Sequence, residues 1–265
     1  MIAVYDLSAC LELLFTEAGP DHGDRVRAAA GYGLPSVEIW SWRDKDLDGL
    51  KRALRDTGTA LTTMCVDPMS PIVDPATHRG WLAGVVESVR VADRLGAPYL
   101  VVTAGDARPG VPRDAQRAAV VAALRAAATV VGSYGVTLLL ENLNSRVDHV
   151  GTFLDSTVEC VDIVREVDSP AVRLLYDHYH SLVMDEHPDA VLAGAIELVG
   201  HVQIADVPGR HEPGTGTIGW ARELSILDGL GYHGLLGLEC RPTRPTPAAL
   251  AHIVAEAAGP RGLVR

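Results

Sequence analysis

Short apolar runs rich in β-branched residues alternate along the chain with longer segments whose apolar positions recur at helical spacing. The short runs predict strands, and the longer segments, which are rich in Ala, Arg and Glu, predict helices. The predicted strands span residues 2–7, 36–41, 60–66, 99–105, 136–143, 172–179, 199–206 and 234–240. The predicted helices lie near residues 22–32, 46–57, 77–95, 113–133, 152–167, 187–198, 219–229 and 246–258.

This order repeats a strand and a helix eight times in one uninterrupted chain of 265 residues. A (β/α)₈ TIM barrel typically needs about 250 residues, and strands buried on both faces read as nearly continuous apolar runs. We therefore expect an α/β fold in which residues 1–265 form a single TIM-barrel domain. A doubly wound open sheet is the alternative. No G-x-G-x-x-G motif follows the first strand, which removes the usual dinucleotide-binding argument for that fold.

The net charge of -11 repels polyanions and argues against nucleic acid as a partner. The N-terminal MIAVYDLSAC lacks the basic segment and long apolar run of a signal peptide, and no stretch is long and apolar enough to predict a membrane span. The four cysteines, at positions 10, 65, 160 and 240, form no C-x-x-C pair, which is typical of reduced, mostly buried thiols. We therefore expect a soluble cytoplasmic protein without membrane contact.

Polar residues stand where several apolar strands should end, and TIM barrels carry their chemistry at the C-terminal ends of the strands. They are Glu38, Glu141, Asp177, Gln203 and Glu239. The last four belong to consecutive predicted strands, and their three carboxylates would repel one another without a cation. Three carboxylates and an amide oxygen are hard donors that suit Mg²⁺ or Mn²⁺. This pattern predicts one divalent metal, Mg²⁺ or Mn²⁺, at the barrel mouth.

Further polar residues follow these candidate ligands. His180 lies just beyond the sixth strand, where an imidazole could reach a substrate oxygen, and Arg210 lies in a Gly/Pro-rich loop, where it could hold a substrate carboxylate bidentately. Glu38 and His201 are candidates for contacts behind the ligands, since His201 precedes Gln203 by two residues on the same strand face. Glu212 is a candidate for orienting Arg210 or His180.

With these residues laid out, the chain resembles the hydroxypyruvate isomerase family within the xylose-isomerase-like sugar isomerases and epimerases. The most specific matching segments are LLLENLNSR (138–146), YDHYHS (176–181), HVQIADVPGRHEPGTG (201–216) and GLECRP (237–242). The resemblance implies a xylose-isomerase-like TIM barrel whose single divalent metal is held by the positions of Glu141, Asp177, Gln203 and Glu239. It also implies that Glu141 and Glu239 form the catalytic acid/base pair and that His180 and Arg210 bind substrate.

Two features bear on the substrate. Glutamine at position 203 resembles the hydroxypyruvate isomerase branch, because the ketose 3-epimerase branch commonly has histidine there. The sequence departs from the family at Asp6-Leu7, where relatives usually show Asn-Leu at the end of the first strand, and in SWRDKDLDGL (41–50). Metal and chemistry therefore transfer from the family more safely than substrate identity does.

The expected reaction is a metal-assisted 1,2-proton shift through an enediolate, converting hydroxypyruvate into tartronate semialdehyde without an organic cofactor. Isomerisation of a 2-oxo-tetronate and C3 epimerisation of a free ketose are alternatives with the same chemistry. A metal-dependent nuclease would need more histidine ligands and a basic face, and a non-catalytic binding barrel is a remoter alternative because all four ligand positions are intact. Barrels of this size often pair through exposed helices, so a homodimer is one assembly to test.

Overall fold

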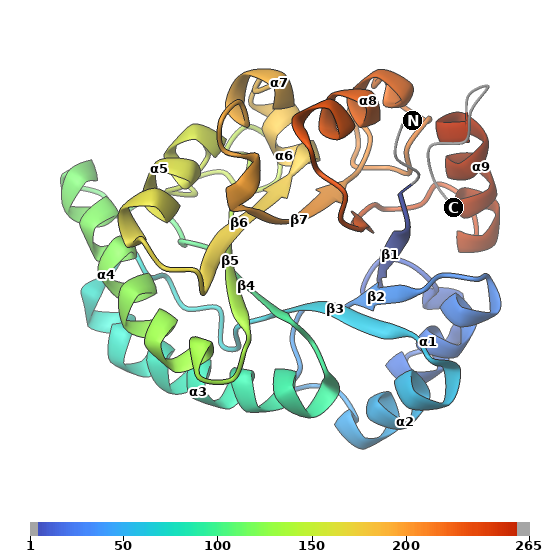
Figure 1. The fold of residues 1–265 in the computed structure, drawn as a ribbon, viewed down its shortest axis with the longest axis horizontal. Coiled ribbons are helices and arrows are strands. Elements are labelled where there is room, and N and C mark those ends of the chain that lie inside the picture. The colour runs from blue at the N-terminus through green and yellow to red at the C-terminus, as the bar shows by residue number, and fades with distance from the viewer. Residues whose placement is uncertain (1–4, 259–265) are drawn as a thin grey trace.

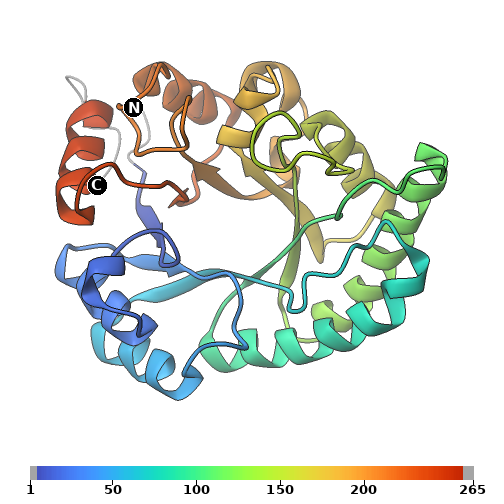
Figure 2. The same cartoon turned by 180° about the vertical axis from the view of Figure 1, so that it is seen from behind.

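The fold was obtained as a computed structural model in which residues 5–258 are described, with side chains to residue 253. Eight parallel strands form a closed barrel in chain order, with β8 hydrogen-bonded to β1. The closed ring confirms the predicted TIM barrel and excludes the doubly wound open sheet. Figure 1 shows the strands at the centre of the ring with the long helices outside them, and Figure 2 shows the same arrangement from behind.

Short strands line the ring, and most connections between them contain a helix. The strands are β1 (Leu7–Cys10), β2 (Ser36–Glu38), β3 (Ala60–Cys65), β4 (Tyr99–Val102), β5 (Thr137–Glu141), β6 (Val172–Asp177), β7 (Val199–Ile204) and β8 (Leu236–Leu238). The helices are α1 (His22–Gly31), α2 (Leu47–Thr57), α3 (His78–Leu95), α4 (Arg113–Gly132), α5 (Thr157–Val167), α6 (His178–Val183), α7 (Pro188–Val191), α8 (Trp220–Leu230) and α9 (Thr246–Ala258). Short 3₁₀ helices lie at Thr16–Ala18, Pro75–Thr77 and Ile196–Leu198.

Local capping chemistry sets the ends of several helices. The side chains of Asp21, Asp46 and Ser156 accept backbone N–H groups in the first turns of α1, α2 and α5. Gly58 and Gly96 follow α2 and α3 with φ of 71° and 77°, a left-handed conformation that glycine adopts without steric cost. These signals account for the starts of α1 and α2 and for the ends of α2 and α3, and α1 to α4 all begin and end within one residue of their predicted limits.

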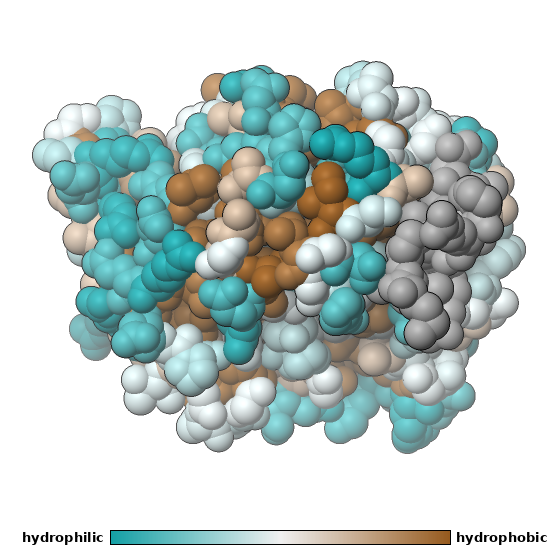
Figure 3. Space-filling model, turned by 45° about the horizontal axis from the view of Figure 1, so that its top comes forward, coloured by the Kyte–Doolittle hydropathy of each residue, from teal (hydrophilic) through white to brown (hydrophobic). Residues whose placement is uncertain are grey.

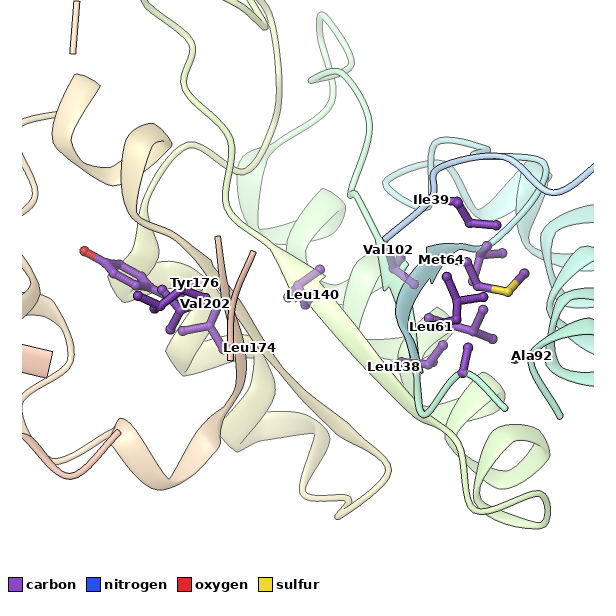
Figure 4. Close-up of a cluster of buried hydrophobic side chains, with 14 of the residues drawn as sticks. Ile39, Leu61, Met64, Ala92, Val102, Leu138, Leu140, Leu174, Tyr176 and Val202 are labelled. Carbon is purple, nitrogen blue, oxygen red and sulfur yellow. The ribbon is translucent and has the colours of Figure 1, made fainter. Parts of the chain in front are cut away.

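Successive side chains along a strand face opposite sides of the barrel wall. Leu138 and Leu140 of β5 belong to the large core between the barrel and its helices, and Figure 4 shows them with Leu174, Tyr176 and Val202 of the next two strands. Leu139 instead belongs to a separate small cluster with Val101, Cys65 and Leu175. Because direction alternates with a period of two, Glu141 lies on the same face as Leu139, above this inner cluster. The apolar strand therefore ends on a carboxylate inside the mouth.

Several predicted strand boundaries were wrong, most of all those of the first and sixth strands. The first strand was placed at 2–7, but the paired residues are Leu7–Cys10, because the small buried side chains of LSAC fit between β2 and β8; residues 1–4 lie outside the described part. Asp6 therefore precedes β1 and does not lie at its C-terminal end, where the family comparison had placed it. The sixth strand ends at Asp177, whose carboxylate accepts the N–H of His180 and so starts an unpredicted helix, α6.

Two predicted helices were also too long. The segment predicted at 152–167 becomes helical only at Thr157, after the Ser156 cap. The segment predicted at 187–198 contains α7 and a 3₁₀ helix, separated by Gly194 at φ 65°. Such interruptions arise because tertiary packing overrides a weak helical pattern.

The surface is polar over much of one face (Figure 3), and the predicted free, buried thiols are confirmed. Figure 3 shows hydrophilic residues over much of one face, with apolar residues visible among them near its centre. Between residues 5 and 258, no helix combines the length and apolar character needed to cross a membrane. All four cysteines are buried and free.

Candidate active site

A cavity of about 250 Å³ opens at the C-terminal ends of the strands. Among the side chains that line it are Glu141, His180, Gln203, Arg210, Glu239 and Arg241. Asp177 lies at the same level, since its Cα is the register partner of Gln203. The barrel thus brings together the four residues that the sequence predicted as metal ligands, together with both predicted substrate-binding residues.

The three carboxylates at the mouth interact strongly because they are buried side by side. Oxygens of Glu141 and Asp177 lie within 4.8 Å of each other and of a ring nitrogen of His180. Burial and the charges of Glu239 and Asp177 raise the pKa of Glu141 well above its ordinary value. Burial also raises the pKa of Asp177, and it raises that of Glu239 to about 7. In both of these groups the opposing effect of Arg210 is smaller than the cost of desolvation.

Arg210 supplies the positive charge that faces these carboxylates. Its Nη2 forms a short ion pair with Oε2 of Glu239 and lies 3.8 Å from Oδ2 of Asp177. Its guanidinium carbon also lies 5.3 Å from the ring centre of Tyr179, within cation–π range. Trp40, two residues beyond Glu38, donates its indole N–H to Oε1 of Glu239 at 2.6 Å. Both oxygens of Glu239 are therefore held in place.

The loop of residues 206–219 presents Arg210 and is organised by a buried carboxylate, Asp206. Asp206 accepts the backbone N–H groups of Val207 and Gly214 at 2.8 and 2.7 Å, and the indole N–H of Trp220 at 3.1 Å. Its own N–H donates to the carbonyl of His211, and Arg210 itself adopts a left-handed φ of 56°. A residue other than glycine in this conformation needs support from its surroundings, which the loop contacts around Asp206 provide.

A second buried network lies one layer below the mouth. Glu38 accepts Nε2 of Gln203 at 2.8 Å on one oxygen and contacts Nε2 of His201 at 2.8 Å on the other. Burial alone would raise the pKa of Glu38, but His201 and Gln203 hold it below its ordinary value. Gly237 of β8 adjoins this network, and a Cβ there would lie 2.8 Å from His201 Nε2 and 2.9 Å from Gln203 Cγ. Because glycine has no Cβ, the side chains of Glu38, His201 and Gln203 can occupy this space.

The donor set fits a divalent cation. Oε1 of Gln203 is buried and has no hydrogen-bond partner among the described residues, because the amide nitrogen is already held by Glu38. A buried acceptor without a partner is rare and points to a missing donor or cation. Three carboxylates at the mouth also exceed the single guanidinium of Arg210 that neutralises them. Oxygen donors of this kind suit Mg²⁺ or Mn²⁺.

His180 is completely buried at the edge of the carboxylate cluster. Its Nδ1 lies 2.6 Å from Nδ2 of Asn144, while its Nε2 lies 3.6 Å from Oδ2 of Asp177. Burial and the nearby charge of Arg210 lower the pKa of His180 well below its ordinary value. Both effects favour the neutral form of the ring.

Glu212 does not have the role that its sequence position suggested. Its carboxylate accepts the N–H and hydroxyl groups of Thr243, both at 2.8 Å, and pairs with Arg244 at 2.9 Å. Within residues 5–253 it contacts neither Arg210 nor His180 directly. The loop after β7 turns its carboxylate away from the cavity, so Glu212 joins that loop to the segment after β8.

Several residues of the site escaped the sequence analysis, among them Arg241 and Asn144. Arg241 lines the cavity, and its N–H donates to the carbonyl of Arg210 at 2.7 Å. Asn144 contacts His180 from the loop that follows β5. Their signal was present, since Asn144 lies in LLLENLNSR and Arg241 in GLECRP, but the periodicity of a strand does not extend into the loop that follows it.

The chain is similar to known proteins over nearly its whole length. Residues 26–256 match a family model described as xylose isomerase-like TIM barrel. The chain is 33% identical to 2-oxo-tetronate isomerase of Cupriavidus necator, covering 86% of this chain and 90% of that protein. It is 28% identical to hydroxypyruvate isomerase of Escherichia coli, covering 92% of this chain and 96% of that protein. A crystal structure titled AP endonuclease, family 2, from Brucella melitensis superposes with a TM-score of 0.87 at 28% identity, covering 94% of this chain and 97% of that one.

Proposed function

The chain belongs to the hydroxypyruvate isomerase family of xylose isomerase-like TIM barrels, and on that premise we propose that it is a metal-dependent isomerase of a small acidic substrate. The reaction is the interconversion of hydroxypyruvate and tartronate semialdehyde by a 1,2-proton shift through an enediolate. One observation carries the proposal: three buried carboxylates and the free amide oxygen of Gln203 meet at a cavity lined by two arginines.

Glu141, Asp177, Gln203 and Glu239 would hold the metal. When bound there, a divalent cation supplies Lewis-acid stabilisation of negative charge on the substrate oxygens. Glu38 fixes the amide of Gln203 through its Nε2, so the carbonyl oxygen is the atom left for the cation. The hydrogen-bonded network of Glu38, His201 and Gln203 thus orients the oxygen donors.

Glu141 and Glu239 are the proposed acid/base pair. They come from β5 and from the residue directly after β8, so they approach the cavity from different parts of the ring. One of them removes the proton alpha to the carbonyl group, and the enediolate is then reprotonated at the neighbouring carbon. Burial raises the pKa of Glu239 to about 7 in the metal-free site, and a bound cation would lower it, so that the carboxylate is ionised and able to accept a proton.

The size and charge of the cavity favour a short, acidic substrate. Its volume of about 250 Å³ lies below the range of about 300–1,000 Å³ that is usual for drug-sized ligands. Arg210 can bind a substrate carboxylate bidentately, and Arg241 adds a second positive charge at the rim. A 2-oxo-tetronate also meets these requirements and is the second candidate, supported by the 33% identity to 2-oxo-tetronate isomerase.

Two other activities receive less support. A free ketose lacks the carboxylate that would use the two arginines. Cleavage of DNA is disfavoured by the net charge of -11 and by a cavity whose charged floor consists of carboxylates.

Proton NMR in D₂O tests the proposal directly. The protein is loaded with Mg²⁺ or Mn²⁺ for turnover, the Mn²⁺ is removed before spectra are recorded, and hydroxypyruvate, a 2-oxo-tetronate and several free ketoses are compared. Loss of the alpha-proton signal reports proton abstraction even when net conversion is small. We expect exchange on an acidic substrate, and the rates on the two acids decide between the candidate substrates.

Three controls frame the result. Chelation and Glu141→Gln should each abolish exchange, whereas Glu223→Gln should retain it, because Glu223 is a buried carboxylate of α8 that pairs with His178 outside the cavity. Exchange on ketoses alone would move the protein to ketose epimerisation. A folded, metal-loaded sample that exchanges none of these compounds would contradict the proposed function and favour a binding role.

A further inference from the structure

The amide of Asn144 beside His180 has no free hydrogen-bonding position. Its Oδ1 accepts the backbone N–H groups of Val147 and Asp148 at 3.0 and 2.9 Å. Its Nδ2 donates one hydrogen to Oδ2 of Asp148 at 2.8 Å and lies 2.6 Å from Nδ1 of His180. Asn144 is fully buried, so water offers no alternative partner. The two N–H donors on one side fix which end of the amide is oxygen.

This orientation determines the tautomer of His180. An amide NH₂ group donates and cannot accept, so Nδ1 of His180 must be the acceptor and carries no proton. An imidazole whose Nδ1 accepts a hydrogen bond carries its single N–H at Nε2. Nε2 is buried, lies on a ring that lines the cavity, and has no hydrogen-bond partner among the described residues. A buried donor without a partner indicates a ligand that supplies the acceptor.

We propose that Asn144 is a positioning residue that holds His180 as the Nε2–H tautomer, so that His180 presents a hydrogen-bond donor to a substrate oxygen and is not a metal ligand. The role in turnover rests on the proposed function; the tautomer does not. Negative charge grows on the substrate oxygen as the alpha proton leaves, and a fixed N–H donor stabilises that charge without reorganising.

The competing interpretation makes His180 a ligand together with Glu141 and Asp177, whose oxygens lie within 4.8 Å of its ring nitrogen. A ligand nitrogen needs a lone pair, so the proton would have to move to Nδ1 and face the NH₂ group of Asn144 at 2.6 Å. Rotating the amide to relieve this contact would break its bonds to Val147 and to Asp148. These hydrogen bonds therefore exclude His180 as a metal ligand. The proposed ligands are then all oxygen donors: Glu141, Asp177, Gln203 and Glu239.

A double variant reverses the tautomer without changing the net charge. In Asn144→Asp with Asp148→Asn, one carboxylate oxygen at 144 still accepts the two backbone N–H groups, and the new amide at 148 donates to that carboxylate. The other oxygen now accepts, so Nδ1 of His180 must carry the proton. Asp148→Asn alone is the matched control, because the hydroxyl of Tyr179 and the amide of Asn144 can both donate to the new carbonyl oxygen.

Long-range ¹H–¹⁵N correlation spectra of ¹⁵N-histidine protein, recorded with Mg²⁺ and again with EDTA, report the tautomer directly. The His180 signals are assigned as those that disappear in His180→Asn. We expect a protonated Nε2 in the wild type and in Asp148→Asn, and a protonated Nδ1 in the double variant. A wild-type ring protonated at Nδ1, or an unchanged tautomer in the double variant, would overturn the proposal.

Two further measurements test the role of the donor. In the exchange assay, kcat of the double variant should fall about 100-fold with little change in KM, while Asp148→Asn, which keeps the Nε2–H tautomer, should retain a kcat well above that of the double variant. The double variant should also gain affinity for Zn²⁺ relative to Mg²⁺, since an imidazole lone pair now faces the carboxylates. An unchanged kcat, or an unchanged metal preference, would refute the donor role. If wild-type protein shows the expected tautomer and metal preference but exchanges no substrate, the proposed function fails and the assignment of the tautomer stands.

Discussion

The buried carboxylates at the barrel mouth predict that metal-free protein loses stability as the pH rises from 4.5 to about 7. Burial raises the pKa of Glu239 from 4.5 to about 7, although Arg210 acts in the opposite direction. A carboxyl group with a higher pKa in the folded chain contributes stability that is fully present below its unfolded pKa. That contribution is lost as the pH rises through the folded pKa, because the folded site then holds a charge that the unfolded chain accommodates better.

The size of this loss in stability follows from the unfolded and folded pKa values of Glu239. For Glu239 the loss runs from pH 4.5 to about 7, and at about 1.4 kcal/mol per pH unit it amounts to about 3 kcal/mol in the free energy of unfolding. Glu239→Gln has no proton to lose at this position. In EDTA the wild type should therefore lose about 3 kcal/mol more than the variant between pH 4.5 and pH 7.

Urea unfolding of both proteins at half-unit pH steps measures this difference. Parallel samples in excess Mn²⁺ form the second arm, where the stabilisation of the wild type should grow with pH because the cation binds the ionised carboxylates. Equal pH dependence of the two proteins in EDTA would refute the reasoning, and so would a wild type that gains stability over the variant as the pH rises.

Three further predictions concern the support of the site. Gly237→Ala should cost about 1–3 kcal/mol of stability and weaken Mn²⁺ binding, because the new methyl group meets the side chains of His201 and Gln203; unchanged thermal unfolding and calorimetry would contradict this. Asp206→Asn removes an acceptor from the loop that carries Arg210 and should raise KM for the acidic substrate about tenfold, with more rapid proteolysis of residues 206–219 and a smaller effect on kcat. Arg210→Lys keeps the charge but loses the bidentate fork, so KM for hydroxypyruvate should rise at least tenfold while Mn²⁺ affinity is maintained; an unchanged KM would argue against carboxylate binding by this residue.

Strand periodicity was sufficient to predict which oxygen-bearing side chains lie together at the barrel mouth. Glu141 and Asp177 end β5 and β6, and Gln203 is the penultimate residue of β7. Parallel strands in a barrel place their C-terminal ends at one mouth, so the sequence order alone brought these side chains together. Glu239 follows β8 directly and obeys the same rule. The first strand was misplaced because IAVYDL has the stronger β-branched pattern, although the barrel pairs LSAC.

Contacts made by loops could not be predicted in this way. The position of Glu212 near Arg210 in sequence suggested a contact, but the left-handed turn at Arg210 directs the two side chains to different partners. The contact between Asn144 and His180 joins the loop after β5 to helix α6, 36 positions further along the chain. Such contacts depend on loop conformation, which hydrophobic periodicity does not encode.

The division between strand ends and loops also has a consequence for divergence among related barrels. The oxygen donors are set by strand register, so a one-residue insertion within β5 would turn Glu141 toward the helices and abolish the site. Arg210 instead lies in a loop that is organised by its own Asp206 and joined to the segment after β8 through Glu212, so this loop and that segment could be exchanged together without altering the strand register. A barrel of this design can thus change the residues that face a substrate by replacing loops, while the strand register that places the oxygen donors stays the same.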